Sequence, residues 1–182
     1  MSGLLLTELA VAGDAPAWEA AGFTVVVDGI RVSQLQLQIG KGEAGIGEWT
    51  LAESATPVEV AHPNGATILD HLVVFSGDPE QTTKEYARFG WEPRRTRDVG
   101  GGRTQTFFKS GEIIIELIGP IPKTVGEQLW GLAFTVCDLP ACAALLGDAL
   151  GRIKDAVQPG RQIATLRHDA CGLTIPIAFM SL

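Results

Sequence analysis

The sequence predicts an α+β fold made of repeated βαβββ units. A first observation is a motif that occurs three times, in which a strand-like apolar segment is followed by an aspartate and then by a proline. The three aspartates are Asp14, Asp78 and Asp138. A second observation is period-two alternation of apolar and polar residues after each motif, which is typical of half-buried strands. Matched strand starts lie 63 and then roughly 60 residues apart, so each repeat is large enough for a helix and four strands.

The three motifs have the chemistry of a helix start. An aspartate side chain can accept hydrogen bonds from free backbone N–H groups, and proline is tolerated in the first turn, where its missing N–H is not needed. Each helical segment is followed by a glycine suited to a left-handed C-terminal cap. We therefore expect helices that stop at Gly22, at Gly90 and near Gly147 or Gly151.

The expected strands follow from the same patterns. The first unit, residues 1–53, has strand-like segments at 6–12, 23–27, 31–39 and 47–52. A linker at 54–66 contains two prolines and an Asn-Gly pair. The second unit, 67–120, has segments that begin at 69 and continue at 91–98, 104–109 and 112–118. The third unit, 128–182, has segments at 130–136, 152–157, 161–167 and 173–180, with Pro176 expected to bend the last.

Composition and charge exclude several classes of function. The 182 residues carry a formal charge of −7, which argues against sequence-independent binding of nucleic acid or anionic lipid. No segment approaches the roughly 20 apolar residues of a membrane span. Three cysteines without CxxC spacing fit a reducing compartment better than a disulfide framework. We expect a cytoplasmic protein that acts on a small molecule, with no nucleic-acid or membrane partner.

The repeated βαβββ unit, with His71 in a first strand and Glu116 in a fourth, resembles the vicinal oxygen chelate superfamily. That group contains glyoxalase I, bleomycin-resistance proteins and extradiol dioxygenases. The resemblance is clearest over residues 67–182, and the segment 158–167 is similar to one in bacterial glyoxalase-like proteins. It implies paired units that curl into a half-open barrel with helices outside. It also implies metal ligands that project inward from first and fourth strands.

Strand alternation allows His71 and Glu116 to be tested as such a pair. In the first strand His71 shares a face with Val73 and Phe75, and in the fourth Glu116 lies opposite an all-aliphatic face. Both side chains are therefore expected on the concave side. There they could bind a divalent zinc, nickel, manganese or iron ion, with Glu116 also the catalytic group. The alternative is a metal-free polar pair in which the two side chains hydrogen-bond each other.

The other repeats decide whether a third metal ligand exists. Aligned with His71 are Glu8 in the first unit and Gly131 in the third, and aligned with Glu116 are Ala52 and Ile177. If the second and third units pair, only two ligands remain. If the first and second pair, Glu8 could be the third. Divalent transition metals normally take three protein ligands and keep open positions for substrate.

Further polar residues surround the last predicted hairpin. Lys154, Gln158 and Arg161 gather around one turn and could bind a carboxylate or phosphate of a ligand; alternatively they are exposed hairpin charges. The arginines at 94, 95 and 97 are expected to be split across two faces of a solvated strand. His62 and His168 are expected at the surface.

Three hypotheses for function follow. The first is a metal-assisted lyase, isomerase or dioxygenase acting on a small oxygenated metabolite. The second is a metal-free protein that sequesters an aromatic or anionic small molecule in the same cleft. The third is an interaction role with a vestigial site. Because three units leave one without an internal partner, that unit could cap the barrel or pair across a homodimer.

Overall fold

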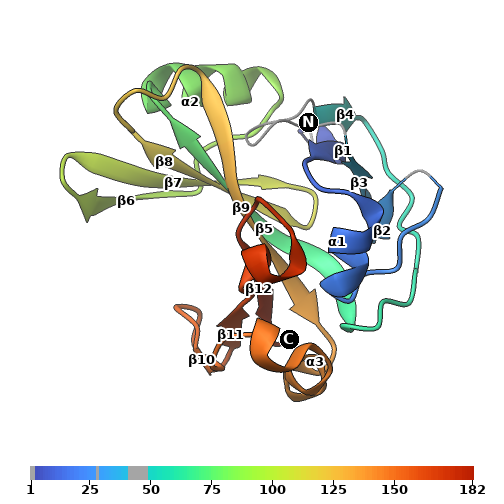
Figure 1. The fold of residues 1–182 in the computed structure, drawn as a ribbon. Coiled ribbons are helices and arrows are strands. Elements are labelled where there is room, and N and C mark those ends of the chain that lie inside the picture. The colour runs from blue at the N-terminus through green and yellow to red at the C-terminus, as the bar shows by residue number, and fades with distance from the viewer. Residues whose placement is uncertain (1–2, 28, 41–48) are drawn as a thin grey trace.

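The computed structural model describes residues 3–27, 29–40 and 49–182, which form two β-sheets and three α-helices (Figure 1). The first unit contains β1 (Leu5–Val11), α1 (Ala15–Ala20), β2 (Ile30–Val32), β3 (Leu35–Ile39) and β4 (Trp49–Ala52). The second contains β5 (Ala66–Ser76), α2 (Pro79–Arg88), β6 (Arg95–Gly100), β7 (Arg103–Ser110) and β8 (Ile113–Gly119). The third contains β9 (Glu127–Val136), α3 (Leu139–Leu146), β10 (Lys154–Asp155), β11 (Gln162–Thr165) and β12 (Ile177–Met180).

The second and third units share one eight-stranded sheet in the order β10-β11-β12-β9-β5-β8-β7-β6. Each unit contributes four neighbouring strands, and the first strands β5 and β9 pair antiparallel at the centre. In that pairing His71 lies opposite Ala133, and Val73 lies opposite Gly131. A residue of the second unit therefore corresponds to the residue 60 positions later in the third unit, and this is also the offset between Asp78 and Asp138. The open choice of pairing is resolved in favour of units two and three.

The aspartate motifs begin helices as predicted. The side chains of Asp14, Asp78 and Asp138 each accept a hydrogen bond from the backbone N–H three residues later, at 3.0, 2.9 and 2.9 Å. A proline follows in the first turn of each helix. The third helix ends at Leu146, and Gly147 follows with a φ of 53°, a conformation that disfavours side chains with a Cβ.

The first unit departs from the prediction. The expected strand at 31–39 is two strands, β2 and β3, joined by a hairpin turn in which Ser33 has a φ of 53°. The segment 23–27 contributes only an isolated bridge between Val26 and Gly29, and residues 47 and 48 of the last expected strand lie outside the described residues. The resulting sheet has the order β2-β3-β1-β4.

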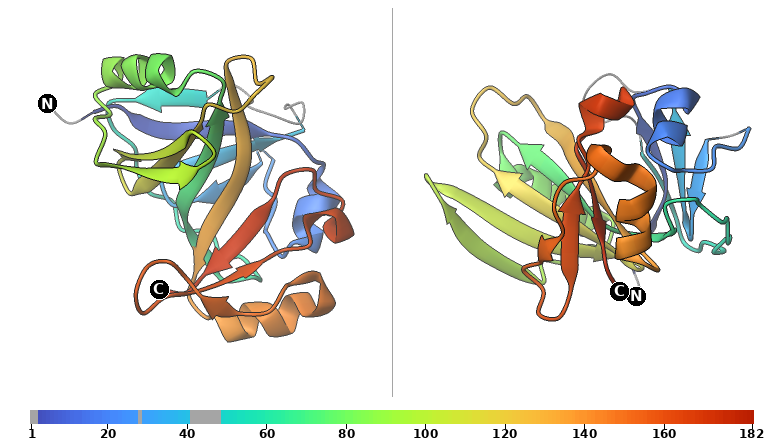
Figure 2. Two further views of the ribbon diagram at one scale, coloured as in Figure 1. Left: turned by 90° about the vertical axis from the view of Figure 1, so that its left-hand side faces the viewer. Right: turned by 60° about the horizontal axis from the view of Figure 1, so that its bottom comes forward.

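The two sheets share a hydrophobic core on the outer face of the larger one. Along β8, and on β5 from Leu72 onward, every second side chain is fully buried, including Leu72, Val74 and Ile115. The four-stranded sheet packs over this face together with the helices (Figure 2). Phe23 of the first unit meets Phe134 of β9 with ring centroids 4.9 Å apart. The opposite, concave face of the eight-stranded sheet is therefore left for a site.

His62 holds the linker against the first unit and is buried, so its expected surface position is wrong. Its Nδ1 accepts from the Thr24 backbone N–H at 3.0 Å, and its Nε2 lies 2.9 Å from the carbonyl oxygen of Arg31. Burial lowers the pKa of His62, and the bond to Arg31 opposes that effect in part. In the part of the chain that the structure describes, the helices are too short or too polar to cross a bilayer.

Candidate functional site

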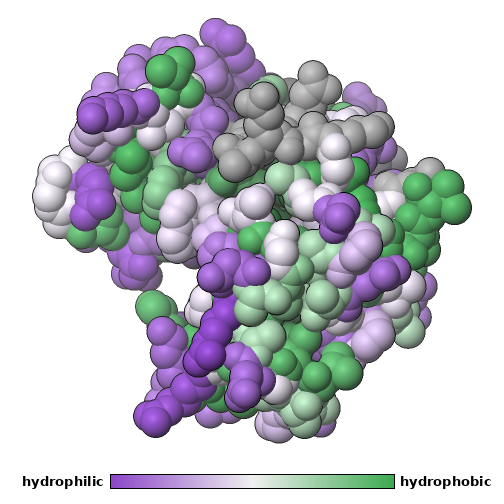
Figure 3. All heavy atoms as spheres, viewed as in Figure 1, coloured by the Kyte–Doolittle hydropathy of each residue, from purple (hydrophilic) through white to green (hydrophobic). Residues whose placement is uncertain are grey.

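A cleft of about 530 Å³ lies on the concave face, between the β6–β7 side of the sheet and the β10–β11 hairpin. Figure 3 shows an indentation there, with hydrophilic side chains gathered over the hairpin below it. The polar groups that line the cleft come from both units and include His71, Arg95, Arg97, Glu116, Lys154 and Gln158. Sequence reasoning selected four of these six. The structure brings them together because β5 and β9 pair.

A β-bulge in β5 shapes the floor of the cleft. Leu69 pairs with Phe134 and His71 pairs with Ala133, so Asp70 is an extra residue on the β5 side. A bulge of this kind turns two successive side chains toward one face. Asp70 consequently lies on the concave side next to His71, where strict alternation would have sent it to the other face.

Asp70 is the centre of a buried network of hydrogen bonds. Its Oδ1 lies 3.0 Å from His71 Nδ1, and its Oδ2 accepts from Arg161 Nη1 at 2.6 Å and from Thr135 Oγ1 at 3.0 Å. Burial alone would raise the pKa of Asp70, but the hydrogen bonds from His71 and Arg161 outweigh it and hold the pKa at about 2. The carboxylate is therefore ionised at neutral pH.

Glu116 is held by a second chain of hydrogen bonds, from β7 and β6. Gln105 donates its Nε2 to Glu116 Oε2 at 2.6 Å, and its Oε1 accepts from Arg97 Nε, also at 2.6 Å. The Arg97 guanidinium lies 5.4 Å from the ring centroid of Phe107, which fixes it further. His71 and Glu116 thus have separate partners: Asp70 for the histidine and Gln105 for the glutamate.

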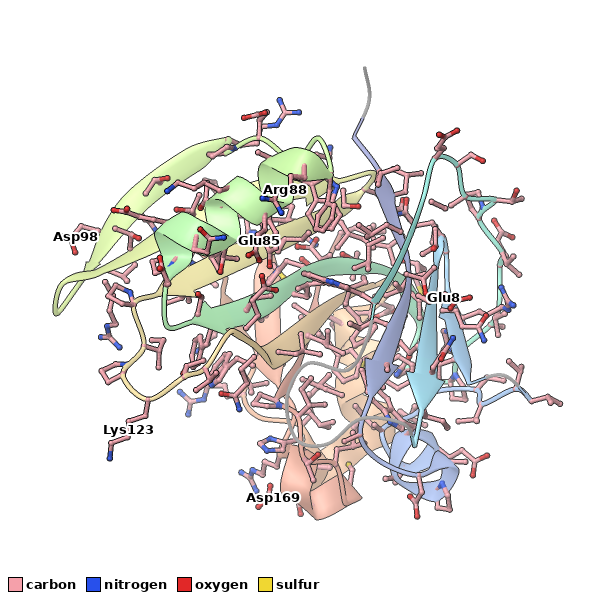
Figure 4. The ribbon with its side chains drawn as sticks, turned by 90° about the horizontal axis from the view of Figure 1, so that it is seen from above. Glu8, Glu85, Arg88, Asp98, Lys123 and Asp169 are labelled. Atoms are coloured by element: carbon pink, nitrogen blue, oxygen red, sulfur yellow. The ribbon has the colours of Figure 1, made fainter. Side chains whose placement is uncertain are left out.

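Two predicted site residues lie elsewhere. Arg161 does not line the cleft, because its guanidinium bonds Asp70, Thr135 and the Ser181 carbonyl oxygen beneath the floor. Glu8 belongs to the four-stranded sheet, as Figure 4 shows, and lines a different pocket. There its Oε2 accepts from Gln38 Nε2 at 2.7 Å and from Thr50 Oγ1 at 3.1 Å.

The strand register also corrects two alignments. Val73 pairs with Glu116 and Ala133 pairs with Ala178, so Ala178, not Ile177, corresponds to Glu116 in the third unit. Ile177 faces the core, since a shift of one residue reverses the face of a strand. In the first unit β3 runs parallel to β1 as β8 does to β5. Gln38 in β3 therefore corresponds to Glu116 in place of Ala52.

The donor set does not fit a resident metal ion. Gly131 and Ala178, the symmetry-related positions, offer no ligand, so the cleft supplies one imidazole and one carboxylate at the places where the fold would hold an ion. Among residues 3–27, 29–40 and 49–182, no three histidine, cysteine, aspartate or glutamate side chains come close enough together to share one. A transition metal held by the chain needs at least three such donors.

Arg95 and Arg97 are the cations of the cleft that sequence reasoning missed. Strand β6 begins at Arg95, so the two arginines are two positions apart on one face and both reach the cleft. A signal was present in the sequence, because alternate arginines in a strand share a face. It was obscured by a third arginine at position 94, which precedes the strand.

No protein-family model matches the sequence, and no curated protein matches it either. Among solved structures, a mutant of 4-hydroxymandelate synthase from Streptomyces coelicolor is 17% identical and has a TM-score of 0.51. That match covers 97% of this chain and 69% of the synthase. A methylmalonyl-CoA epimerase from Mycobacterium tuberculosis is 17% identical over 64% of this chain and 89% of its own, with a TM-score of 0.49.

A Streptomyces coelicolor methylmalonyl-CoA epimerase in complex with 2-nitronate-propionyl-CoA is 20% identical, with a TM-score of 0.49. That match covers 64% of this chain and 97% of the epimerase. The synthase, whose TM-score is 0.51, is a vicinal oxygen chelate protein. The chain thus has the vicinal oxygen chelate, or glyoxalase-like, fold, and the resemblance found in the sequence is confirmed at the level of the fold. At these identities the likeness extends to the fold alone.

Proposed function

We propose that the protein binds a small anionic molecule in the cleft between its second and third units, without a metal ion held by the chain. The observation that carries this proposal is the charge of the cleft. Arg95, Arg97 and Lys154 outnumber the two carboxylates that line it, Glu116 and Asp155, although the whole chain carries a charge of −7. A local excess of cations in an acidic protein favours an anionic ligand.

The shape of the cleft supports the same proposal. A volume of about 530 Å³ is in the range of sites for small molecules. Its wall combines these cations with apolar side chains, among them Phe107, Ile163 and Met180. Such a wall suits a ligand with a charged group and a compact apolar part. Gln158, on the loop after β10, adds an amide to the wall.

Binding of carboxylates tests this proposal directly. Calorimetric titration at low ionic strength with benzoate, glycerate and inorganic phosphate should detect binding, and Arg95→Gln and Lys154→Gln should each weaken it at least about threefold. Arg88→Gln is the matched control, since Arg88 is an exposed cation on α2 outside the cleft (Figure 4). The proposal fails if none of the anions binds, or if the control weakens binding as much as the cleft variants.

A metal-assisted lyase, isomerase or dioxygenase is a second candidate, favoured by the bond between Asp70 and His71. A carboxylate that accepts from one ring nitrogen commonly orients a histidine whose other nitrogen binds metal. Here the ligand itself would have to supply the missing donors. Elemental analysis of protein purified without chelator, beside His71→Ala, separates the candidates. A metal that copurifies with the wild type and is lost in the variant would favour the enzyme.

A further inference from the structure

Two chains of hydrogen bonds reach the cleft, and the direction of donation along each chain indicates the chemical class of ligand that would fit. Each chain starts at an arginine, which can only donate, and ends at a cleft residue. One runs from Arg161 to Asp70 and His71, and the other runs from Arg97 through Gln105 to Glu116. Because each hydrogen bond sets which atom of the next group donates and which accepts, the roles of His71 and Glu116 toward a ligand follow from the two arginines.

In the first chain the proton on His71 is placed by Asp70. An ionised carboxylate only accepts hydrogen bonds, and Asp70 already accepts from Arg161 and Thr135 at its other oxygen. The Nδ1 of a neutral His71 must therefore carry the proton. Its Nε2 is then left as an acceptor on a side chain that lines the cleft and is 14% exposed.

In the second chain the amide of Gln105 is oriented in the same way. Arg97 Nε donates to its oxygen, so its nitrogen must be the atom that faces Glu116. Since that nitrogen donates, the Oε2 atom of Glu116 accepts, and the side chain of Glu116 lines the cleft as a hydrogen-bond acceptor. Glu116 pairs with Val73, two residues beyond His71 on the same face of β5. The two acceptors are therefore diagonal neighbours on adjacent strands.

We infer that the ligand is an anion that carries hydrogen-bond donors beside its charge, such as a hydroxy acid or an amino acid. The cations Arg95 and Lys154 would receive the anionic group, and His71 Nε2 and Glu116 would accept from O–H or N–H groups on neighbouring atoms. A ligand without donors would leave His71 Nε2, and the acceptor capacity of Glu116 that Gln105 does not use, desolvated and unsatisfied, which costs affinity. This inference rests on the proposed anion binding and specifies its chemical class.

A series of three-carbon acids tests the inference at about pH 8, above the ordinary range of histidine titration. Lactate should bind about tenfold more tightly than propionate, and glycerate more tightly again. Alanine, which carries an ammonium group where lactate has a hydroxyl, tells whether O–H or N–H donors are preferred. Propionate binding as tightly as lactate and alanine would overturn the inference while leaving anion binding intact. No binding by any member would overturn the inference, and it would overturn anion binding as well if benzoate and phosphate also fail to bind.

Asp70→Asn should reverse the ligand preference of the cleft, which would not happen if Asp70 only stabilised the fold. Arg161 requires an acceptor, so the oxygen of the introduced amide should face it and the amide nitrogen should donate to His71 Nδ1. The proton would move to Nε2, and the variant should prefer pyruvate, an acceptor, to lactate. In the wild type, long-range ¹H–¹⁵N NMR of the imidazole tests the tautomer without any variant. A proton on Nε2 of wild-type His71 would overturn the inference.

Discussion

Asp70 and Trp130 occupy equivalent positions in the second and third units, and each is the extra residue of a β-bulge. Asp70 is unpaired between Leu69 and His71 on β5, and Trp130 is unpaired between Leu129 and Gly131 on β9. The two extra residues differ in burial and in contacts. Asp70 is buried and orients a histidine, whereas Trp130 is 47% exposed and stacks on Phe75 with ring centroids 5.3 Å apart. The repeat has kept the backbone geometry and changed the chemistry.

Trp130→Ala should cost about 1 kcal/mol in the free energy of unfolding, because the change removes one half-exposed stacking contact and leaves the core intact. It should also remove part of the fluorescence that acrylamide can quench, since Trp18 and Trp91 are at most 1% exposed and only the partly buried Trp49 would remain as a second accessible tryptophan among the described residues. Trp18→Phe, a change in the core, is the control and should leave the quenchable fraction in place. Urea denaturation and quenching measure the two effects. A loss of several kcal/mol in Trp130→Ala would contradict the exposed position.

Ala178→Glu should create a metal site. Ala178 is the symmetry partner of Glu116, so the new carboxylate would join His71 and Glu116 as a third donor. We expect the affinity for Zn²⁺, measured by calorimetry, to rise at least about a hundredfold. The double variant with His71→Ala should lose most of that gain. Unchanged affinity in Ala178→Glu would show that the two positions do not converge.

Glu127→Gln should change how stability depends on pH. Burial raises the pKa of Glu127 to about 7, although the hydrogen bond from Tyr86 opposes the effect and Glu85 adds to it. The folded protein therefore holds a proton that the unfolded chain releases near 4.5, and wild-type stability falls as the pH rises from about 4.5 to about 7. Glu127→Gln has no titrating group at this position, so its stability does not fall in this way as the pH rises. Urea denaturation should find it more stable by on the order of 1 kcal/mol at about pH 8, after allowance for partial exposure, with no gain near pH 4.

Acid should weaken the attachment of the linker at His62. Its pKa is lowered by burial, so the unfolded chain binds a proton more readily and stability falls as the pH drops below about 6.5. His62→Ala should remove this dependence and cost about 2–3 kcal/mol at neutral pH, because Thr24 N–H and the Arg31 carbonyl lose their partner. Chemical denaturation at two pH values measures both. His168→Ala, which changes a half-buried histidine outside this contact, should do neither.

The fold could be predicted from local chemistry that repeats. Asp78 and Asp138 cap their helices, and the alternation around Glu116 puts the aliphatic residues of β8 on the buried face, as the sequence suggests. The first unit was harder because its break falls at Ser33. Positive φ is expected of glycine or asparagine, so a serine gives no warning of a turn.

The chemistry of the site was less accessible for a related reason. A one-residue bulge reverses the face of every later side chain, and no residue type announces one at Asp70. Strict alternation would place Asp70 on the other side of the strand from His71, so the sequence offers Glu116 and not Asp70 as the partner of His71. The long-range members of the network, Thr135 and Arg161, depend on the pairing of β5 with β9, which the sequence left open between two arrangements.

The packing of the first unit over the outer face has a consequence for how this protein can change. On β8, Leu117 lies in the shared core while Glu116, its neighbour in the chain, faces the cleft. Folding and recognition are therefore carried by alternate residues of the same strands. Replacing the inward-facing set can alter what is bound at little expense to stability, because large losses come mainly from substitutions in the core. The same scaffold is thus open to new ligands through substitutions at every second position.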